Sequence, residues 1–447
     1  MNTTWLTNTE YLDVEVRQAR EEGKDVTPFM ERIEAVKSLH QLDREVMAAK
    51  LVDEIAHFPV GTDFPYSEPS DLEGIRAERP EGPRRLEARL SDEQLYDKVY
   101  GAWLGRCAGC LLGKPVEGYA MRPNGREGIR EFLKATNAYP LEDYFDFQYP
   151  DDFLTKYGFS PQQKSFDPST LGRMPEDDDT NYTVLGLHIL EQYGIDFTPE
   201  DVSEAWLSHL PLLHTCTAER VAYRNLANLI MPPMSAVHRN PYREWIGAQI
   251  RADMWGYVTP GNPELGAELA WRDACISHTK NGIYGEMFVA AMLSAAFATS
   301  DVEEIIRAGL SEIPARSRLA EAVNDILGWW KEDNADWEKA LDKVYGKYGH
   351  YHPVHTINNA LLVCTGLLYG GLDFGKSIGI AVMGAWDTDC NGATVGSIVG
   401  LILGAKALPE KWVRPLQDTL ETGVQGYNLV KISELASRAA RLAQGRN

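Results

Sequence analysis

Two short acidic motifs, far apart in the chain, contain the residues best suited to chemistry. In PEDDDTNYTVLGL, four consecutive acids, residues 176–179, precede Thr180 and an apolar stretch. In AWDTDCNGATVGSIVGLI, Asp387 and Asp389 stand in the same position before a second apolar stretch. If the two motifs converge, the repulsion among their carboxylates has to be relieved by protonation or by a cation. Carboxylate and hydroxyl oxygens suit Mg²⁺, Mn²⁺ or Ca²⁺ better than Zn²⁺, so the motifs predict a site for a divalent metal ion.

Two regular series of glycines indicate how these motifs are brought together. A glycine recurs at every fourth residue in both series, which are Gly101, Gly105, Gly109 and Gly113, and Gly392, Gly396, Gly400 and Gly404. A glycine inside a helix costs about 1 kcal/mol relative to alanine, so such a series needs a structural reason. Small residues at this spacing allow two helix backbones to approach closely. We therefore expect the two glycine-rich helices to pack together and to bring the acidic motifs together.

Helical periodicity dominates the chain and predicts an all-α fold. Apolar residues recur at three- and four-residue spacing in many segments, including residues 180–194, 267–300, 318–332, 358–370 and 393–408. Alternating patterns typical of strands are almost absent.

Two parts are expected along the chain. Residues 1–90 form a helical N-terminal extension that ends in a linker, residues 61–85, rich in proline, glycine and charge. Residues 91–447 form the main multi-helix domain, with Ser91 as the N-cap of its first helix. Within that domain, residues 137–170 are an irregular insertion rich in aromatic, acidic and proline residues. This insertion is too long for an ordinary loop, and we expect it to lie near the site.

The composition excludes several classes of function. A formal net charge of -21 argues against a nucleic-acid partner, which requires a basic surface. Neither a secretory signal peptide nor an apolar segment long enough to cross a bilayer is evident, so no membrane partner is expected. The cysteines include one C-x-x-C pair, Cys107 and Cys110, without a second pair, and we interpret them as reduced thiols of a cytoplasmic protein. The P-loop and G-x-G-x-x-G motifs are absent, and the oligomeric state stays open.

Four motifs, in order and spacing, resemble those of the ADP-ribosylglycohydrolase family. They are GAWLGRCAGCLLGKPVEG (101–118), DDDT (177–180), ISHTKNGIYGE (276–286) and WDTDCNGATVGSIVGLILGA (386–405). The resemblance runs from about residue 94 to residue 408. It implies an all-α domain with two divalent metal ions, Mg²⁺ or Mn²⁺, with Ca²⁺ as a further option. It also implies release of ADP-ribose from arginine, serine or another acceptor.

The resemblance assigns roles to particular residues. The implied metal ligands are Asp177, Asp178, Asp179, Asp387, Asp389 and Cys390. The candidate catalytic residues are Glu117, in a G-x-P-x-E element, with Asp178 and Asp387. The candidate substrate contacts that it implies are His278, Gly113 and Arg251. Apart from the resemblance, the polar helix start HPVHTINNA adds His355 and Asn358 as candidate contacts. In this mechanism metal ions hold ribose hydroxyls and a water, while a carboxylate transfers the proton in an oxocarbenium-like cleavage.

Three positions depart from the family pattern. Asp177 stands where the family usually has Thr or Ser, Cys390 replaces the last Thr of D-T-D-T, and Cys110 stands where Asp is common. These departures keep a second hypothesis open, an enzyme of the same fold that acts on another N- or O-glycoside or a small sugar metabolite. A third hypothesis is a non-catalytic binding or structural relative. It is disfavoured because buried acids that serve no function would be costly to keep.

The expected partner is a small-molecule glycoside or an ADP-ribosylated substrate. An anionic pyrophosphate in such an acidic protein requires nearby cations. The basic residues that lie in or beside the motifs in the sequence are Arg251, Lys280 and Lys114.

Overall fold

A computed structural model describes residues 4–122, 125–332 and 336–444 of the chain. Helices make up nearly all of its regular structure, which confirms the all-α prediction. The strands found in these residues form one small antiparallel sheet, in which β1 (Thr419–Glu421) pairs with β2 (Leu429–Lys431). In the part of the chain so described, no helix is both long enough and apolar enough to cross a lipid bilayer.

Two helices in direct backbone contact form the centre of the main domain. They are α5 (Asp92–Gly113) and α21 (Thr388–Leu403). Ser91 caps α5 as expected, and the Gln94 side chain completes a capping box. A Cβ added at Gly109 would lie 1.9 Å from the carbonyl oxygen of Gly392, and one at Gly105 would lie 2.0 Å from that of Gly396. Glycine is therefore required along this contact, as the two glycine series predict.

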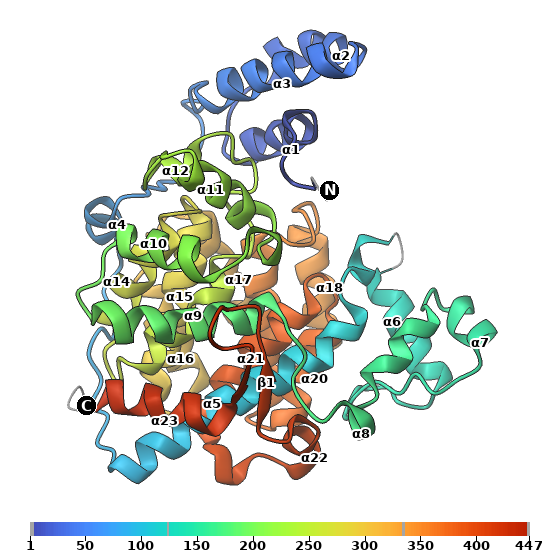
Figure 1. Cartoon of the computed structure of the whole chain (residues 1–447), viewed down its shortest axis with the longest axis vertical. Helices are drawn as coiled ribbons and strands as arrows, with labels where there is room; N and C mark the ends of the chain where they lie inside the picture. Colours follow the sequence, from blue (N-terminus) through green and yellow to red (C-terminus); the bar gives the residue numbers. More distant parts are fainter. Residues whose placement is uncertain (1–3, 123–124, 333–335, 445–447) are drawn as a thin grey trace.

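Other helices surround this pair and bury most of its surface. The neighbours are α9 (Asp178–Tyr193), α13 (Asp253–Tyr257), α15 (Asn281–Ala296), α19 (Thr356–Gly370), α20 (Phe374–Met383) and α23 (Ile432–Ala443), and α14 (Pro263–Ala274) packs against α15. Helices at the periphery are α4 (Leu72–Glu78), α6 (Gly125–Ala135), α7 (Asp151–Lys156), α8 (Pro168–Leu171), α10 (Pro199–His209), α11 (Thr217–Ala227), α12 (Met234–Val237), α16 (Val302–Leu310), α17 (Arg318–Glu332), α18 (Trp337–Tyr348) and α22 (Glu410–Val413). Figure 1 shows their arrangement around α5 and α21.

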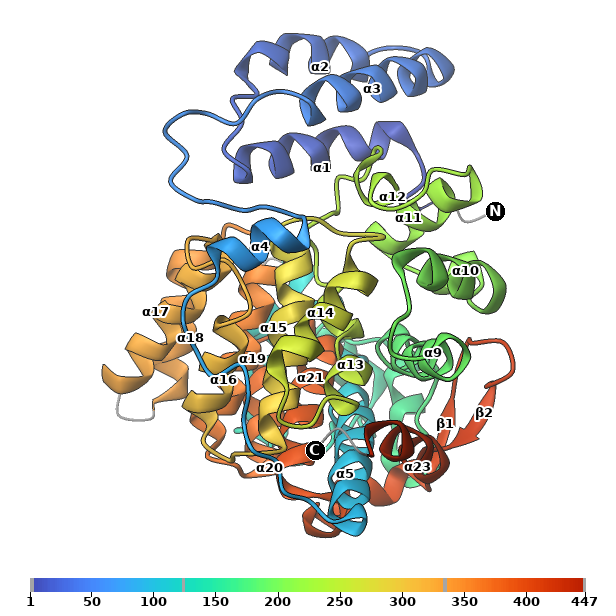
Figure 2. The same ribbon diagram turned by 90° about the vertical axis from the view of Figure 1, so that its left-hand side faces the viewer.

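The N-terminal extension forms a separate layer of helices at one end of the molecule. Its helices are α1 (Asn8–Glu21), α2 (Met30–Lys37) and α3 (Gln41–Ala56). Both views place α1 between the other two helices and α11 and α12 of the main domain (Figures 1 and 2). Apolar residues of the extension share a small core with Ala218, Val221, Tyr242 and Trp245 of the main domain. One face of α1 thus packs the helical layer onto the main domain, and Asp53 of α3 adds an ion pair with Arg239 at 2.6 Å.

The irregular segment over residues 137–170 packs as a largely aromatic layer beside α6. Phe147 stacks on Phe132 at a centroid distance of 5.5 Å, and Phe159 contacts both rings. Together with residues 411–417, part of the segment lines a cavity of about 590 Å³. No residue of the two acidic motifs lines that cavity.

Candidate active site

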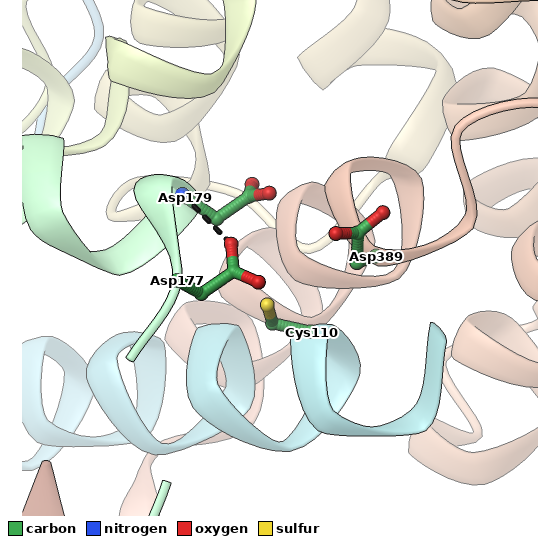
Figure 3. Close-up of side chains that lie close together, drawn as sticks. All are labelled: Cys110, Asp177, Asp179 and Asp389. Carbon is green, nitrogen blue, oxygen red and sulfur yellow. Dashed lines mark hydrogen bonds between the residues drawn. The ribbon is translucent and has the colours of Figure 1, made fainter. Parts of the chain in front are cut away.

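The acidic motifs meet where three helix ends converge. The end of α5 carries Cys110, the start of α9 carries Asp177 and Asp179, and the start of α21 carries Asp389 (Figure 3). One ligand atom from each of these four residues lies within 4.8 Å of all the others. We call these residues the inner cluster. Asp387, Asp389 and Cys390 satisfy the same distance limit and form an outer cluster that shares Asp389.

Hydrogen bonds satisfy only part of the inner cluster. One oxygen of Asp177 accepts from the backbone N–H of Asp179 at 2.9 Å, and Lys114 Nζ donates to the other. Arg106, which is fully buried, donates to Asp179 Oδ1 at 3.1 Å. The buried oxygens Asp179 Oδ2 and Asp389 Oδ1 have no hydrogen-bond partner among the described residues. Unpaired buried carboxylate oxygens are costly, and a divalent cation would satisfy them, so the residues fit a metal ion.

The protonation equilibria of the acids reflect their crowding. Burial, and then the charge of Asp177, raises the pKa of Asp389 to about 6. Burial and neighbouring carboxylates also raise the pKa of Asp178, Asp179 and Asp387 well above its ordinary range. The site therefore favours either bound protons or a bound cation.

A cleft of about 410 Å³ opens onto the acids. Its acidic part is lined by Glu117, Asp178, Glu219, Asp387, Asp389 and Cys390. Its aromatic and apolar part includes Trp5, Val14, Met121, Tyr242, Trp245, Ile246, Ile250, His352, Val354 and Trp386. Trp245 and His352 stack with a centroid distance of 4.1 Å. The cleft thus combines a charged end with flat apolar surfaces, as expected of a small-molecule site.

Glu117 lies on a turn that directly follows α5. Residues Lys114–Val116 form one turn of 3₁₀ helix, and Glu117 ends it with its side chain exposed in the cleft. The charge of Asp389, followed by the loss of hydration between the walls of the cleft, raises the pKa of Glu117 well above its ordinary range. This placement suits a group that transfers a proton to or from a bound molecule.

The chain before Asp387 has an uncommon backbone conformation. Ala385 and Trp386 have φ angles of 60° and 56°, a left-handed conformation that costs roughly 1–2 kcal/mol per non-glycine residue. Trp386 stacks on Tyr345 at 4.3 Å, and Asn359 Oδ1 accepts from the backbone N–H of Asp387 at 3.1 Å. The surrounding contacts therefore hold a strained turn that fixes the direction of Asp387.

Three of the expected substrate contacts are engaged inside the protein. The Gly113 carbonyl accepts from Thr388 Oγ1 at 2.9 Å, where α5 meets α21. His355 caps α19 by accepting from the N–H of Ile357, and burial lowers its pKa to about 3. Asn358 donates to the carbonyl of His352 at 3.1 Å. None of these three residues is in the lining of the cleft.

The other two expected contacts are also buried outside that lining. Arg251 donates to Asp273 at 2.6 Å and to Glu219 at 3.0 Å. His278 Nδ1 lies 2.8 Å from Ser277 Oγ. Of the expected catalytic and metal residues, Glu117, Asp178, Asp387, Asp389 and Cys390 line the cleft, whereas Asp177 and Asp179 lie in the inner cluster. The expected insertion, residues 137–170, contributes nothing to the described lining.

Several residues at the site were not anticipated from the sequence. Arg106 binds both Asp179 and Asp253. The only feature of the sequence that could have indicated this role is a charged residue between two glycines of an otherwise apolar helix. Trp5, Glu10 and Val14 come from the extension. Nothing in their local sequence pattern indicates that they line a cleft with residues of the main domain that are distant in the sequence.

Comparisons with known proteins identify one matching family. Residues 91–447 match the family model described as ADP-ribosylglycohydrolase. Among solved structures, the chain is similar to one titled "ADP-ribosylglycohydrolase-related protein complex". The two share 20% identity, with 78% of this chain and 99% of that chain covered and a TM-score of 0.45. A search among curated proteins gives no significant match.

Proposed function

This chain belongs to the ADP-ribosylglycohydrolase family, and from that premise we propose that it hydrolyses a ribosyl glycosidic bond, of the ADP-ribosyl type, with divalent metal ions. The observation that carries the proposal is the convergence of both acidic motifs at one end of a cleft of about 410 Å³. Unpaired oxygens on Asp179 and Asp389 indicate that the arrangement is completed by a cation.

The inner and outer clusters define two positions for Mg²⁺ or Mn²⁺, with Ca²⁺ as a further option. The proposed ligands are Asp177, Asp179, Asp387 and Asp389 of these clusters and Asp178 of the cleft lining, with Cys390 beside the outer position. A bound divalent ion supplies a Lewis acid that holds sugar hydroxyls and lowers the pKa of a water.

The chain's own groups orient the substrate and move the proton. Glu117 faces the cleft from a turn and is the candidate acid that protonates the departing glycosidic oxygen or nitrogen, or the candidate base that takes a proton from the attacking water. Asp178 and Asp387 line the same end and stabilise positive charge that develops on the sugar ring during cleavage. The aromatic part of the cleft excludes water from the remainder of the substrate.

A hydrolysis assay with added Mg²⁺ or Mn²⁺ tests the proposal. Release of ADP-ribose from ADP-ribosyl-arginine or ADP-ribosyl-serine would support it. Asp387→Ala is expected to lower kcat/KM by at least ~10²-fold, because it removes a carboxylate shared by the metal position and the cleft. Full activity in that variant, or a purified protein with no affinity for Mg²⁺, Mn²⁺ or Ca²⁺, would contradict the proposal.

A second candidate is hydrolysis of another N- or O-glycoside without a pyrophosphate. The three basic residues that lie in or beside the motifs all form ion pairs with carboxylates. Lys114 pairs with Asp177, and Lys280 pairs with Glu22. Arg251 pairs with Glu219 and Asp273. None of the three is in the lining of the cleft, which favours a substrate without phosphates. Turnover of a plain glycoside without any release of ADP-ribose would select this candidate.

A further inference from the structure

Three residues of the N-terminal extension form part of the wall of the cleft. Trp5, Glu10 and Val14 line it together with Tyr242 and Trp245 of the main domain. Glu10 and Val14 lie on α1, and Trp5 precedes that helix by a few residues. Helix α1 therefore closes a part of the cleft that the acidic helices leave open.

Buried ion pairs hold α1 firmly in this position. Arg243 donates to Glu15 at 2.7 Å and to Glu22 at 2.8 Å, and all three side chains are buried. Gln18 donates to Glu244, which also pairs with Arg318 at 2.7 Å. Breaking a buried ion pair is strongly unfavourable, so α1 is a fixed wall.

Trp5 is fixed in a similar way. The guanidinium of Arg220 lies 4.8 Å from the centroid of its ring, and Arg220 also donates to the backbone carbonyl of Thr4 at 3.2 Å. Arg220 is buried, donates otherwise to the carbonyls of Leu213 and Thr215, and does not line the cleft.

Two polar groups of this wall lack a complete set of partners. Tyr242 is only 1% exposed, and its hydroxyl has no hydrogen-bond partner among the described residues. Glu10 Oε2 accepts from the backbone N–H of Trp5 at 2.8 Å, and no described residue donates to its other oxygen. A buried hydroxyl without a partner is costly, so a bound ligand that supplies one would gain affinity.

The charge of the wall indicates the kind of ligand. The lining described for the cleft contains no lysine or arginine, whereas it contains Glu10 and several other carboxylates. Tyr242, Trp245 and Trp5 supply aromatic surface, which attracts organic cations.

We propose that Trp5, Glu10, Val14 and Tyr242 form a specificity subsite that binds an ammonium-bearing, largely apolar leaving group of the substrate. The ammonium donates to Glu10 and to the Tyr242 oxygen, while the apolar body packs on Trp5 and Val14. This inference rests on the proposed function only in identifying the bound group as the leaving group. Binding at the subsite can be measured without turnover.

Calorimetric titration of the full-length, Mn²⁺-loaded protein tests the subsite with two probes, benzylammonium and benzyl alcohol. The probes have nearly the same shape and differ in charge, so benzylammonium is expected to bind about tenfold tighter. Glu10→Gln is expected to weaken benzylammonium binding about tenfold, and Tyr242→Phe about fivefold. Because the Tyr242 hydroxyl has no partner within the described protein, Tyr242→Phe is expected to leave thermal stability unchanged or raised.

Matched controls separate the subsite from general effects. Asp13→Asn removes a carboxylate from α1 at a side chain 69% exposed, and Tyr223→Phe removes a hydroxyl outside the cleft, so neither is expected to change binding. Equal binding of the two probes, binding of neither, or unchanged affinity in both subsite variants would overturn the proposal. Mn²⁺ binding is measured on the same samples. Its absence would refute the proposed function, whereas the comparison of probes and variants would still decide the subsite.

Discussion

At the scale of single residues, Lys114 is the group that most changes the interpretation of the metal site. Its ammonium donates to Asp177 and is held next to the inner cluster, where it would compete with a bound metal ion for one carboxylate oxygen. The sequence indicated Lys114 only as a cation near the substrate. Its pairing with Asp177 could not be predicted, because it depends on how the end of α5 meets the start of α9.

Lys114→Gln is expected to tighten Mn²⁺ binding about tenfold, because it removes a competing positive charge and keeps most of the length of the side chain. Calorimetric titration of the metal-free protein with Mn²⁺ measures the change. Lys98→Gln on α5 is the control, since Lys98 donates to the carbonyls of Leu401 and Ile402 away from the acids. Unchanged or weaker Mn²⁺ binding in Lys114→Gln would show that the ammonium does not compete.

At the scale of elements, the contact between α5 and α21 determines the geometry of the site. The sequence predicted this contact correctly, because a glycine at every fourth residue destabilises a helix unless a second backbone packs closely against it. It also predicted that both acidic motifs begin helices. It did not predict which partners the polar residues have. His278, Arg251 and Asn358 have the residue types of substrate contacts, but tertiary packing engages them inside the protein.

Gly109→Ala is expected to lower the free energy of unfolding by about 3 kcal/mol, since the new Cβ would meet a backbone carbonyl at 1.9 Å and the helices would have to separate. Chemical denaturation measures this loss, and metal binding is expected to weaken with it. Gly346→Ala on α18 is the matched control, because a Cβ there has no neighbour within 4 Å. Ordinary helix propensity predicts that the control is more stable by about 1 kcal/mol. Equal stability of the two variants would contradict the close-contact interpretation.

At the scale of the whole molecule, the extension and the main domain are joined by buried charges as well as by apolar contacts. Near the C-terminal end of α1, burial and the charge of Glu244 raise the pKa of Glu21 to about 8, above its ordinary value of 4.5. At neutral pH the folded protein therefore keeps a proton on Glu21, whereas the unfolded chain has already released it. The corresponding stability is complete below pH 4.5 and is lost as the pH rises toward 8.

Glu21→Gln imitates the protonated carboxyl and is expected to remove this loss. At pH 8 the variant should be more stable than the parent protein by on the order of 4 kcal/mol, whereas near pH 4.5 the two should be similar. Unfolding curves recorded across this pH range provide the measurement. Glu31→Gln, at an exposed position on α2, is expected to follow the parent protein. A constant difference between Glu21→Gln and the parent at every pH would rule out titration of Glu21 as the cause.

The position of α1 has a consequence for how the protein is synthesised. Glu15 pairs with Arg243, which lies 228 residues later in the chain. At typical translation rates of about 5–20 residues per second, α1 leaves the ribosome roughly 10–45 s before this partner exists. During that interval Tyr11, Leu12 and Val16, which are buried in the finished protein, have no main domain to cover them. Helix α1 is thus synthesised well before the residues that fix it in place, and the part of the cleft wall that it forms is completed only after Arg243 has been added.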